Sequence, residues 1–198
     1  MTNKSSFFAE VIESFLTHYK AQCWPSRVAP SYGALVVIED GPLVLYSVVS
    51  ACVTQADSAV YAVRAYQKTE EELRSDQPHV FALLHTIVTG LIVGFTTTQD
   101  SEMQYRSTAV PARLHAFVRL ATDHEWALFA HNTRCLAMLF NQAAQVNLDE
   151  LLLAFMCELK RHVSVPEGYL IELLHAYTLW TGNDYRRMRV FAQRLEQL

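Results

Sequence analysis

The side chains best suited to hold a metal ion lie near the middle of the chain. His131 and Cys135 are four residues apart in a segment with helical periodicity, and His124 precedes them. That spacing puts two ligands on one face of a helix, an arrangement that zinc sites use. A zinc site needs three or four ligands, however, and the sequence offers no evident third and fourth. Packing within a helix therefore explains these residues better, and we predict no metal and no cofactor.

Three consecutive glutamates, Glu70, Glu71 and Glu72, could supply a carboxylate pair for acid–base catalysis. Such chemistry also needs a cleft and a shifted pKa, and the sequence indicates neither. Thr69 and Glu72 have the spacing of a capping box, and carboxylates stabilise the N-terminus of a helix. The sequence therefore predicts that this cluster starts a helix.

Common nucleophile and nucleotide-binding motifs are missing from the sequence. Cys23 adjoins Trp24 and lacks the basic neighbours that favour a reactive thiolate. No G-x-S-x-G elbow occurs, and no G-x-x-x-x-G-K-[ST] run is present to hold a nucleotide phosphate. We predict no catalytic residues and a protein that is not an enzyme. An enzyme with an unrecognised site is the alternative.

Aromatic residues and arginine, the types that anchor protein interfaces, occur in two places. The aromatic group lies near expected strand ends or turns, and the basic group lies in the last helix, where it could grip phosphate or a partner's carboxylates. The plainer interpretations are barrel core for the aromatics and a solvated helix face for the arginines. The predicted partner-binding residues are Trp24, Tyr32, Tyr46, Arg186, Arg187, Arg189 and Arg194.

Composition indicates a folded protein with a sizeable core. The chain has 198 residues, of which 51% are apolar and 18% charged, with a net charge of -4. This balance argues against disorder and against a general nucleic-acid binder. Four scattered cysteines without a C-x-x-C pair predict a reduced, cytoplasmic protein. The longest apolar segment, 80–95, contains His85 and falls short of the roughly 20 residues of a membrane helix, so we predict no membrane span.

Strand signals dominate the first half of the chain. Segments 32–38 and 43–49 flank an Asp-Gly turn and predict a hairpin. Segments 59–66 and 87–95 predict further strands, the second of which would close the sheet, whereas 8–23 is ambiguous between helix and strand. Two short helices are expected between them, because Thr69 with Glu72 marks one start and Pro78 marks another.

Helical signals dominate the second half. The polar segment 98–113 is the expected linker between a domain at 7–97 and a helical domain at 114–198. Capping residues predict about four helices, which form a small bundle or pack on the barrel. They start at Thr122, Asn147, Pro166 and Asn183, and the apolar face of the first continues to Phe140.

Several runs of residues are similar to those of HAS-barrel proteins, the β-barrel shared by HerA-type DNA-translocating ATPases and the subunits of the ATP synthase catalytic head. The opening runs are FAEVIES at 8–14, AQC at 21–23 and PSYGALV at 30–36. The later runs are TEEEL at 69–73, QPHVFALL at 77–84 and VGF at 93–95. The tail, with PARLHAF at 111–117 and NDYRRMR at 183–189, resembles that of stand-alone cyanobacterial members.

The resemblance implies that segment 8–23 forms two barrel strands. It also implies an assembly role, since the family's barrels pack beside one another in rings or dock a partner nuclease. The ATPase domain and its phosphate-binding motif are missing here, which weakens the implication of a ring.

The sequence thus predicts an α+β protein with an N-terminal six- or seven-stranded HAS-like β-barrel, a short helical insertion and a small C-terminal helical bundle. The predicted function is a non-enzymatic adaptor or assembly factor that docks its barrel on a larger protein complex. The alternative is an accessory subunit of a HerA-type DNA-processing ATPase or nuclease complex, with direct contact to nucleic acid not expected.

Overall fold

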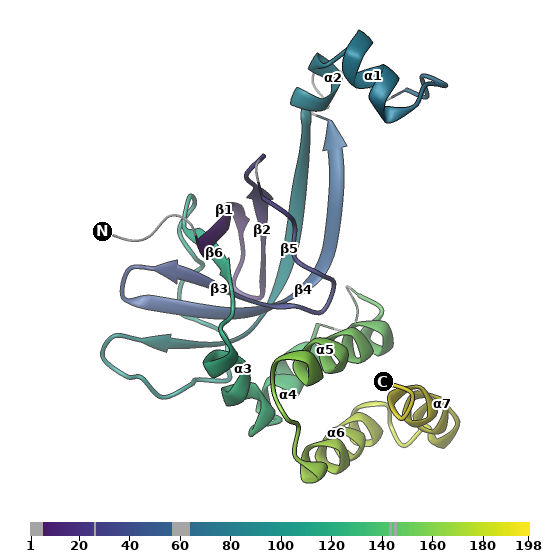
Figure 1. The fold of residues 1–198 in the computed structure, drawn as a ribbon. Helices are drawn as coiled ribbons and strands as arrows, with labels where there is room; N and C mark the ends of the chain where they lie inside the picture. Colours follow the sequence, from purple (N-terminus) through teal and green to yellow (C-terminus); the bar gives the residue numbers. More distant parts are fainter. Residues whose placement is uncertain (1–5, 26, 57–63, 143, 145) are drawn as a thin grey trace.

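A computed structural model describes residues 6–25, 27–56, 64–142, 144 and 146–198. Its six strands pair antiparallel and close into a barrel in the order β1-β2-β5-β4-β3-β6 (Figure 1). They are β1 (Phe7–Ser14), β2 (His18–Cys23), β3 (Leu35–Asp40), β4 (Leu43–Ala56), β5 (Leu84–Thr97) and β6 (Phe117–Leu120). The predicted barrel is confirmed.

Two of the strand predictions are confirmed in detail. The segment that was ambiguous between helix and strand forms β1 and β2, as the resemblance implies. The Asp-Gly turn joins β3 to β4, with Asp40 opposite Leu43 across it. Gly41 takes a φ of 61°, a left-handed conformation that favours glycine at this turn.

The closing strand is not the one that the sequence predicts. β5 lies inside the sheet, between β2 and β4, whereas β6 pairs with both β1 and β3 and closes the barrel. The sheet therefore extends beyond the expected linker at 98–113 into the region assigned to helices. Of the strand expected at 59–66, residues 59–63 lie outside the described residues and 64–66 have no regular structure.

Seven helices occur in the described residues. They are α1 (Glu70–Asp76), α2 (His79–Ala82), α3 (Asp123–Ala130), α4 (Arg134–Phe140), α5 (Leu148–His162), α6 (Glu167–Trp180) and α7 (Tyr185–Leu195). The capping boxes at Thr69 and Thr122 are both present, as predicted. The last helix is capped by Asp184 and not by Asn183, which instead takes a φ of 64°.

The helix expected to run from Thr122 to Phe140 is broken into α3 and α4. Asn132 lies at the break, and its side-chain oxygen accepts a hydrogen bond from the backbone N–H of Arg134 at 2.9 Å. An asparagine that bonds to the backbone in this way competes with helical hydrogen bonds. The chain therefore turns at a point where hydrophobic periodicity alone predicts a continuous helix.

Side chains fill the interior of the barrel. The ring of Tyr19 on β2 lies directly opposite Gly90 on β5, and its hydroxyl is 2.9 Å from the hydroxyl of Ser47 on β4. A Cβ atom at Gly90 would lie 2.5 Å from the Tyr19 ring. Glycine is thus needed at this position because the tyrosine occupies the space above it.

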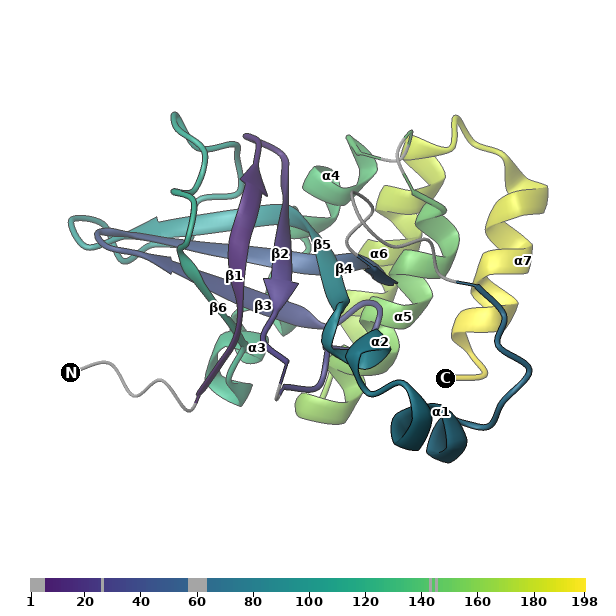
Figure 2. The ribbon, with the colours of Figure 1, turned by 90° about the horizontal axis from the view of Figure 1, so that it is seen from above.

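The helices α3 to α6 pack on one side of the barrel (Figure 2). Leu35, Val37 and Val48 on the outer face of the sheet share one buried cluster with Trp126 and Phe155 from the helices. This core crosses the expected domain boundary, so the helices pack on the barrel and do not form a separate bundle. In the part of the chain that the structure describes, no helix is long and apolar enough to cross a membrane.

A two-stranded arm projects from the barrel on the side away from α3 to α7 (Figure 1). It consists of residues 51–56 of β4, the facing residues 84–89 of β5, and helices α1 and α2 at its tip. β3 pairs with β4 only up to Val48, and β2 pairs with β5 only from Ile87. β5 therefore keeps β2 as a neighbour at the base of the arm, and only residues 54–56 and 84–86 are two-stranded.

Candidate interaction surfaces

A cavity lies where the arm leaves the barrel. It has a volume of about 350 Å³ and is bounded by the end of β2 on one side and by the start of β5 on the other. Its lining residues are Gln22, Cys23, Trp24, Pro25, Arg27 and residues 81–86. Strand β2 turns away after Cys23 while β5 continues, which opens the hollow between them.

Trp24 forms a wall of this cavity. Its indole N–H donates to Glu10 at 3.1 Å, and its ring meets Phe117 edge-on at 5.6 Å between ring centroids. A second hollow of about 240 Å³, which also includes Trp24 and His115, lies beside it. Trp24 is therefore a fixed, half-buried ring at the surface, as expected of a residue that anchors an interface.

The tip of the arm has well-formed helix ends but no core. At α1 the hydroxyl of Thr69 accepts from the N–H of Glu72 at 3.3 Å, and the Glu72 carboxylate accepts from the N–H of Thr69 at 2.8 Å. Neither α1 nor α2 contains a buried residue. The glutamates considered for acid–base chemistry thus serve helix capping and, at Glu70, an ion pair with Arg74.

The two predicted tyrosines differ in their surroundings. Tyr32 is 38% exposed in the loop before β3, and burial of part of its ring, with Glu150 nearby, raises its pKa. Tyr46 is only 6% exposed, and its ring packs against Phe129 of α3 at 5.7 Å between centroids. Tyr46 is part of the core between barrel and helices, as in the plainer interpretation of the aromatic residues as core.

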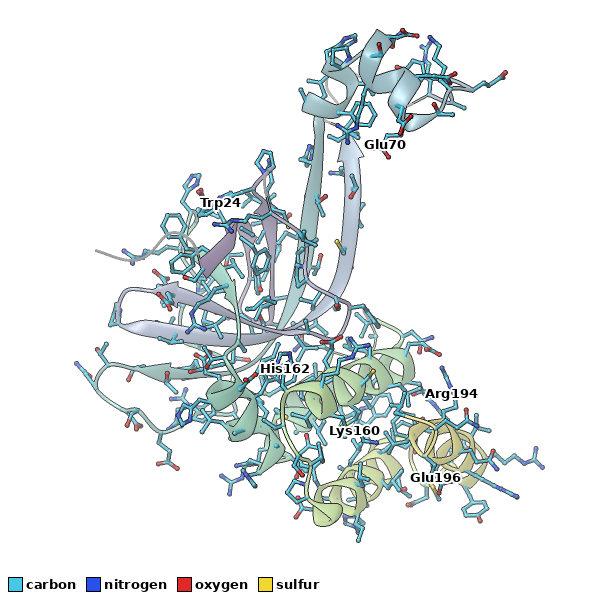
Figure 3. The ribbon with its side chains drawn as sticks, viewed as in Figure 1. Trp24, Glu70, Lys160, His162, Arg194 and Glu196 are labelled. Atoms are coloured by element: carbon cyan, nitrogen blue, oxygen red, sulfur yellow. The ribbon has the colours of Figure 1, made fainter. Side chains whose placement is uncertain are left out.

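Two of the four predicted arginines hold α7 to the rest of the protein. Arg187 binds Asp149 through two nitrogens, at 2.7 and 3.1 Å, and lies over the ring of Trp180. Arg194, labelled in Figure 3, binds Glu150 through two nitrogens at 2.7 and 2.9 Å. Both carboxylates are in the first turn of α5. These two arginines have a structural role that the sequence analysis did not assign.

Arg186 and Arg189 remain available on the exposed side of α7. Both are exposed, and neither has an ion-pair partner in the described part of the chain. Trp24 and Arg194 lie at opposite ends of the molecule in Figure 3. The structure therefore separates Trp24, at the base of the arm, from Arg186 and Arg189 on α7.

The residues considered for metal or thiol chemistry do not form a site. The described residues contain no group of three or more histidine, cysteine, aspartate or glutamate side chains that could hold a metal ion. Cys135 is buried among the helices, and this burial raises its pKa to about 12. Burial likewise raises the pKa of Cys23 to about 11. Both thiols are thus held in their neutral, unreactive form.

An ion-pair network that the sequence analysis missed joins the barrel to the helices. Arg119 on β6 donates to Glu39 on β3 at 2.7 Å and to both carboxylate oxygens of Glu125 on α3 at 2.8 Å. Burial works against the charged form of Glu125, but the hydrogen bonds from Arg119 and Thr122 outweigh it and lower its pKa. Every charged group here has a partner, which marks the network as structural.

The chain matches no protein-family model, and no curated protein matches it significantly.

Proposed function

We propose that this protein is a non-enzymatic interaction subunit, an adaptor or assembly factor, that docks its β-barrel on a larger protein complex. The observation that carries the proposal is the arm. Helix α1 begins with a complete capping box, and α1 and α2 are held away from the body without a buried residue among those that the structure describes. Helices this short are unstable without packing, because nucleation costs more than a few hydrogen bonds return. A partner that covers them supplies the missing contacts.

The base of the arm supplies the anchor in this proposal. Trp24 is rigid and half-buried, and the adjoining cavity of about 350 Å³ is large enough to accept a side chain of a partner. Side chains fill the barrel interior, so they leave no room for a ligand there. Recognition of a partner therefore falls to the outer surface and the loops. Burial of a standard patch of about 800 Å² on each partner suffices for stable attachment.

The proposal keeps the resemblance to HAS-barrel proteins, whose barrels take part in assemblies. It also places the protein in the cytoplasm, where thiols stay reduced, in agreement with four cysteines that are all free.

The proposal is tested by affinity purification of the tagged protein from its native host, followed by identification of the co-purifying chains. We expect a stoichiometric protein partner that is lost when Trp24 is changed to alanine. Native mass spectrometry of the purified chain is the companion measurement. A tightly bound small molecule together with the absence of any partner would support an enzyme with an unrecognised site instead.

A second candidate is an accessory subunit of a DNA-processing complex. It draws on Arg186 and Arg189, which remain exposed on α7 after Arg187 and Arg194 are used internally. This version predicts salt-sensitive retention on DNA that the double change Arg186→Glu and Arg189→Glu abolishes. Retention that ignores both changes, or no retention at all, excludes it.

A further inference from the structure

The outer edge of β4 in the arm has a row of backbone groups that no residue described in the structure pairs with. Residues 51–56 pair with β5 on one side, but on the other side none of them forms a backbone hydrogen bond with any described residue. In an antiparallel strand every second residue directs both its N–H and its C=O away from the existing neighbour. This segment, which we call the β4 edge, therefore presents donors and acceptors that an added strand can satisfy.

The β4 edge lacks the devices that usually prevent such pairing. Natural edge strands are protected by charged residues, proline or bulges. The sequence of the β4 edge is Ala-Cys-Val-Thr-Gln-Ala, which has no charge and no proline. The irregularity in β4 falls before Ala51, and pairing with β5 is regular from there to Ala56. Residues 52–55 of the β4 edge are all exposed.

We infer that the β4 edge pairs with the β4 edge of a second copy of this chain, antiparallel and about a two-fold axis. The chemistry of the edge calls for an extended strand, and its own sequence is a suitable one. Because the segment is uncharged, two copies place no like charges opposite each other. Because the arm projects from the body, the edge is accessible to an equally projecting edge (Figure 1).

The stability of the arm gives a further reason for this pairing. The outer part of the arm, residues 54–56 and 84–86, is a two-stranded ribbon, because β2 pairs with β5 only from Ile87 onward. Such a ribbon is marginally stable in water, and three or more strands are needed for independent stability. Pairing of two β4 edges converts two such ribbons into one four-stranded sheet with a closed, isologous interface. The paired segment is only six residues long, so the dimer is expected to be weak and dependent on protein concentration. This inference does not rest on the proposed function, because a monomeric adaptor is equally able to dock.

The test is sedimentation of the whole chain over a wide concentration range, with two matched variants. Val53 is 51% exposed on the β4 edge, and Val53→Lys places like charges close together across the two-fold axis. Val28 is 91% exposed in the loop before β3, and Val28→Lys is the control for the same change in charge. We expect wild type and Val28→Lys to dimerise alike, and Val53→Lys to dissociate at about tenfold higher concentration or more.

Hydrogen exchange shows which residues form the dimer contact. It also distinguishes loss of that contact from an indirect effect of the Val53→Lys change. In the dimer, alternate amides among residues 51–56 should exchange more slowly as protein concentration rises, and they should remain fast in Val53→Lys. A chain that stays monomeric at all concentrations overturns the inference, as does a dimer that Val53→Lys leaves intact. Protection of these amides only by a different protein assigns the edge to another partner and also overturns it.

Discussion

The same sequence motif occurs twice in this protein, once in the body and once in the arm. Thr122 with Glu125 and Thr69 with Glu72 form capping boxes, and in both the glutamate accepts from the threonine N–H at 2.8 Å. In the body, Glu125 is also bound by Arg119 of the barrel, and Trp126 beside it is buried. In the arm, the helix that Glu72 starts buries nothing. A capping box therefore sets where a helix begins but not what the helix packs against.

The largest difference in stability between a change in the body and a change in the arm is expected at Arg119. Its change to alanine leaves Glu125, whose side chain is 12% exposed, without its main partner. Removal of one member of a buried ion pair costs about 3 kcal/mol or more of unfolding free energy. Urea denaturation measures this, with Arg74→Ala in the arm as the matched control, because Arg74 pairs with Glu70 on an exposed helix. We expect the control to change the unfolding free energy by less than about 0.5 kcal/mol. Equal losses of unfolding free energy in Arg119→Ala and Arg74→Ala would contradict the difference between a packed body and an exposed arm.

A somewhat smaller effect is expected inside the barrel, at Gly90. Alanine there puts a Cβ atom 2.5 Å from the Tyr19 ring, and overpacking of this kind costs about 1–3 kcal/mol. Gly168→Ala in α6 is the matched change, because no atom lies within 4 Å of the added Cβ. Since alanine favours a helix over glycine, that variant should gain up to about 1 kcal/mol. Thermal or urea unfolding measures both changes in stability. A change of the same sign in Gly90→Ala and Gly168→Ala would contradict the packing of the barrel interior.

The network at Arg119 also predicts a dependence of stability on pH. The pKa of Glu125 is lowered in the folded protein, so its contribution is present above the unfolded value of about 4.3 and is lost as the pH falls through the folded value. The unfolding free energy of Glu125→Gln should therefore fall less steeply below pH 4.3 than that of wild type. Urea denaturation across this range measures the difference between the two proteins, which should shrink in an Arg119→Ala background because only the hydrogen bonds from Thr122 then remain. A steeper loss in Glu125→Gln would show that the sign is wrong.

The smallest effects on stability are expected in the arm. Val53→Ala and Glu71→Ala change exposed side chains without ion pairs, so each should alter the unfolding free energy by less than about 0.5 kcal/mol. Urea denaturation of the isolated chain measures both. A loss above about 1.5 kcal/mol at either site would indicate that the arm packs on the body, because core positions give losses of that size.

Much of the local structure could be predicted from the sequence, because it depends on neighbouring residues. The capping boxes, the Asp-Gly hairpin and the start of α6 at Pro166 follow from residues a few positions apart. Strand β6 could not be predicted in this way, since its four residues give too short a pattern and its place depends on β1 and β3. Periodicity likewise missed the break between α3 and α4, which a single asparagine produces.

The predicted interface residues differ in their surroundings, because their contacts also depend on residues far away in the sequence. Trp24 and Tyr32 reach the surface, where contact with a partner stays a prediction, but Tyr46 is buried by helices far along the chain. Arg187 and Arg194 bind Asp149 and Glu150, nearly forty residues or more away in the sequence. A local pattern identifies residues that are able to form an interface. It does not say whether the partner is another protein or another part of the same chain.

The account is tested most directly by the effect of an arm-tip variant on partner binding. Glu71 on α1 is exposed and has no ion pair with any residue that the structure describes, so Glu71→Lys reverses a charge on the proposed docking surface without disturbing the body. Glu102→Lys, at an exposed site in the β5–β6 connection, is the control. In quantitative affinity purification from the native host, we predict that Glu71→Lys loses the partner that wild type and Glu102→Lys retain. Equal recovery of the partner by all three proteins would contradict a role for the arm in docking.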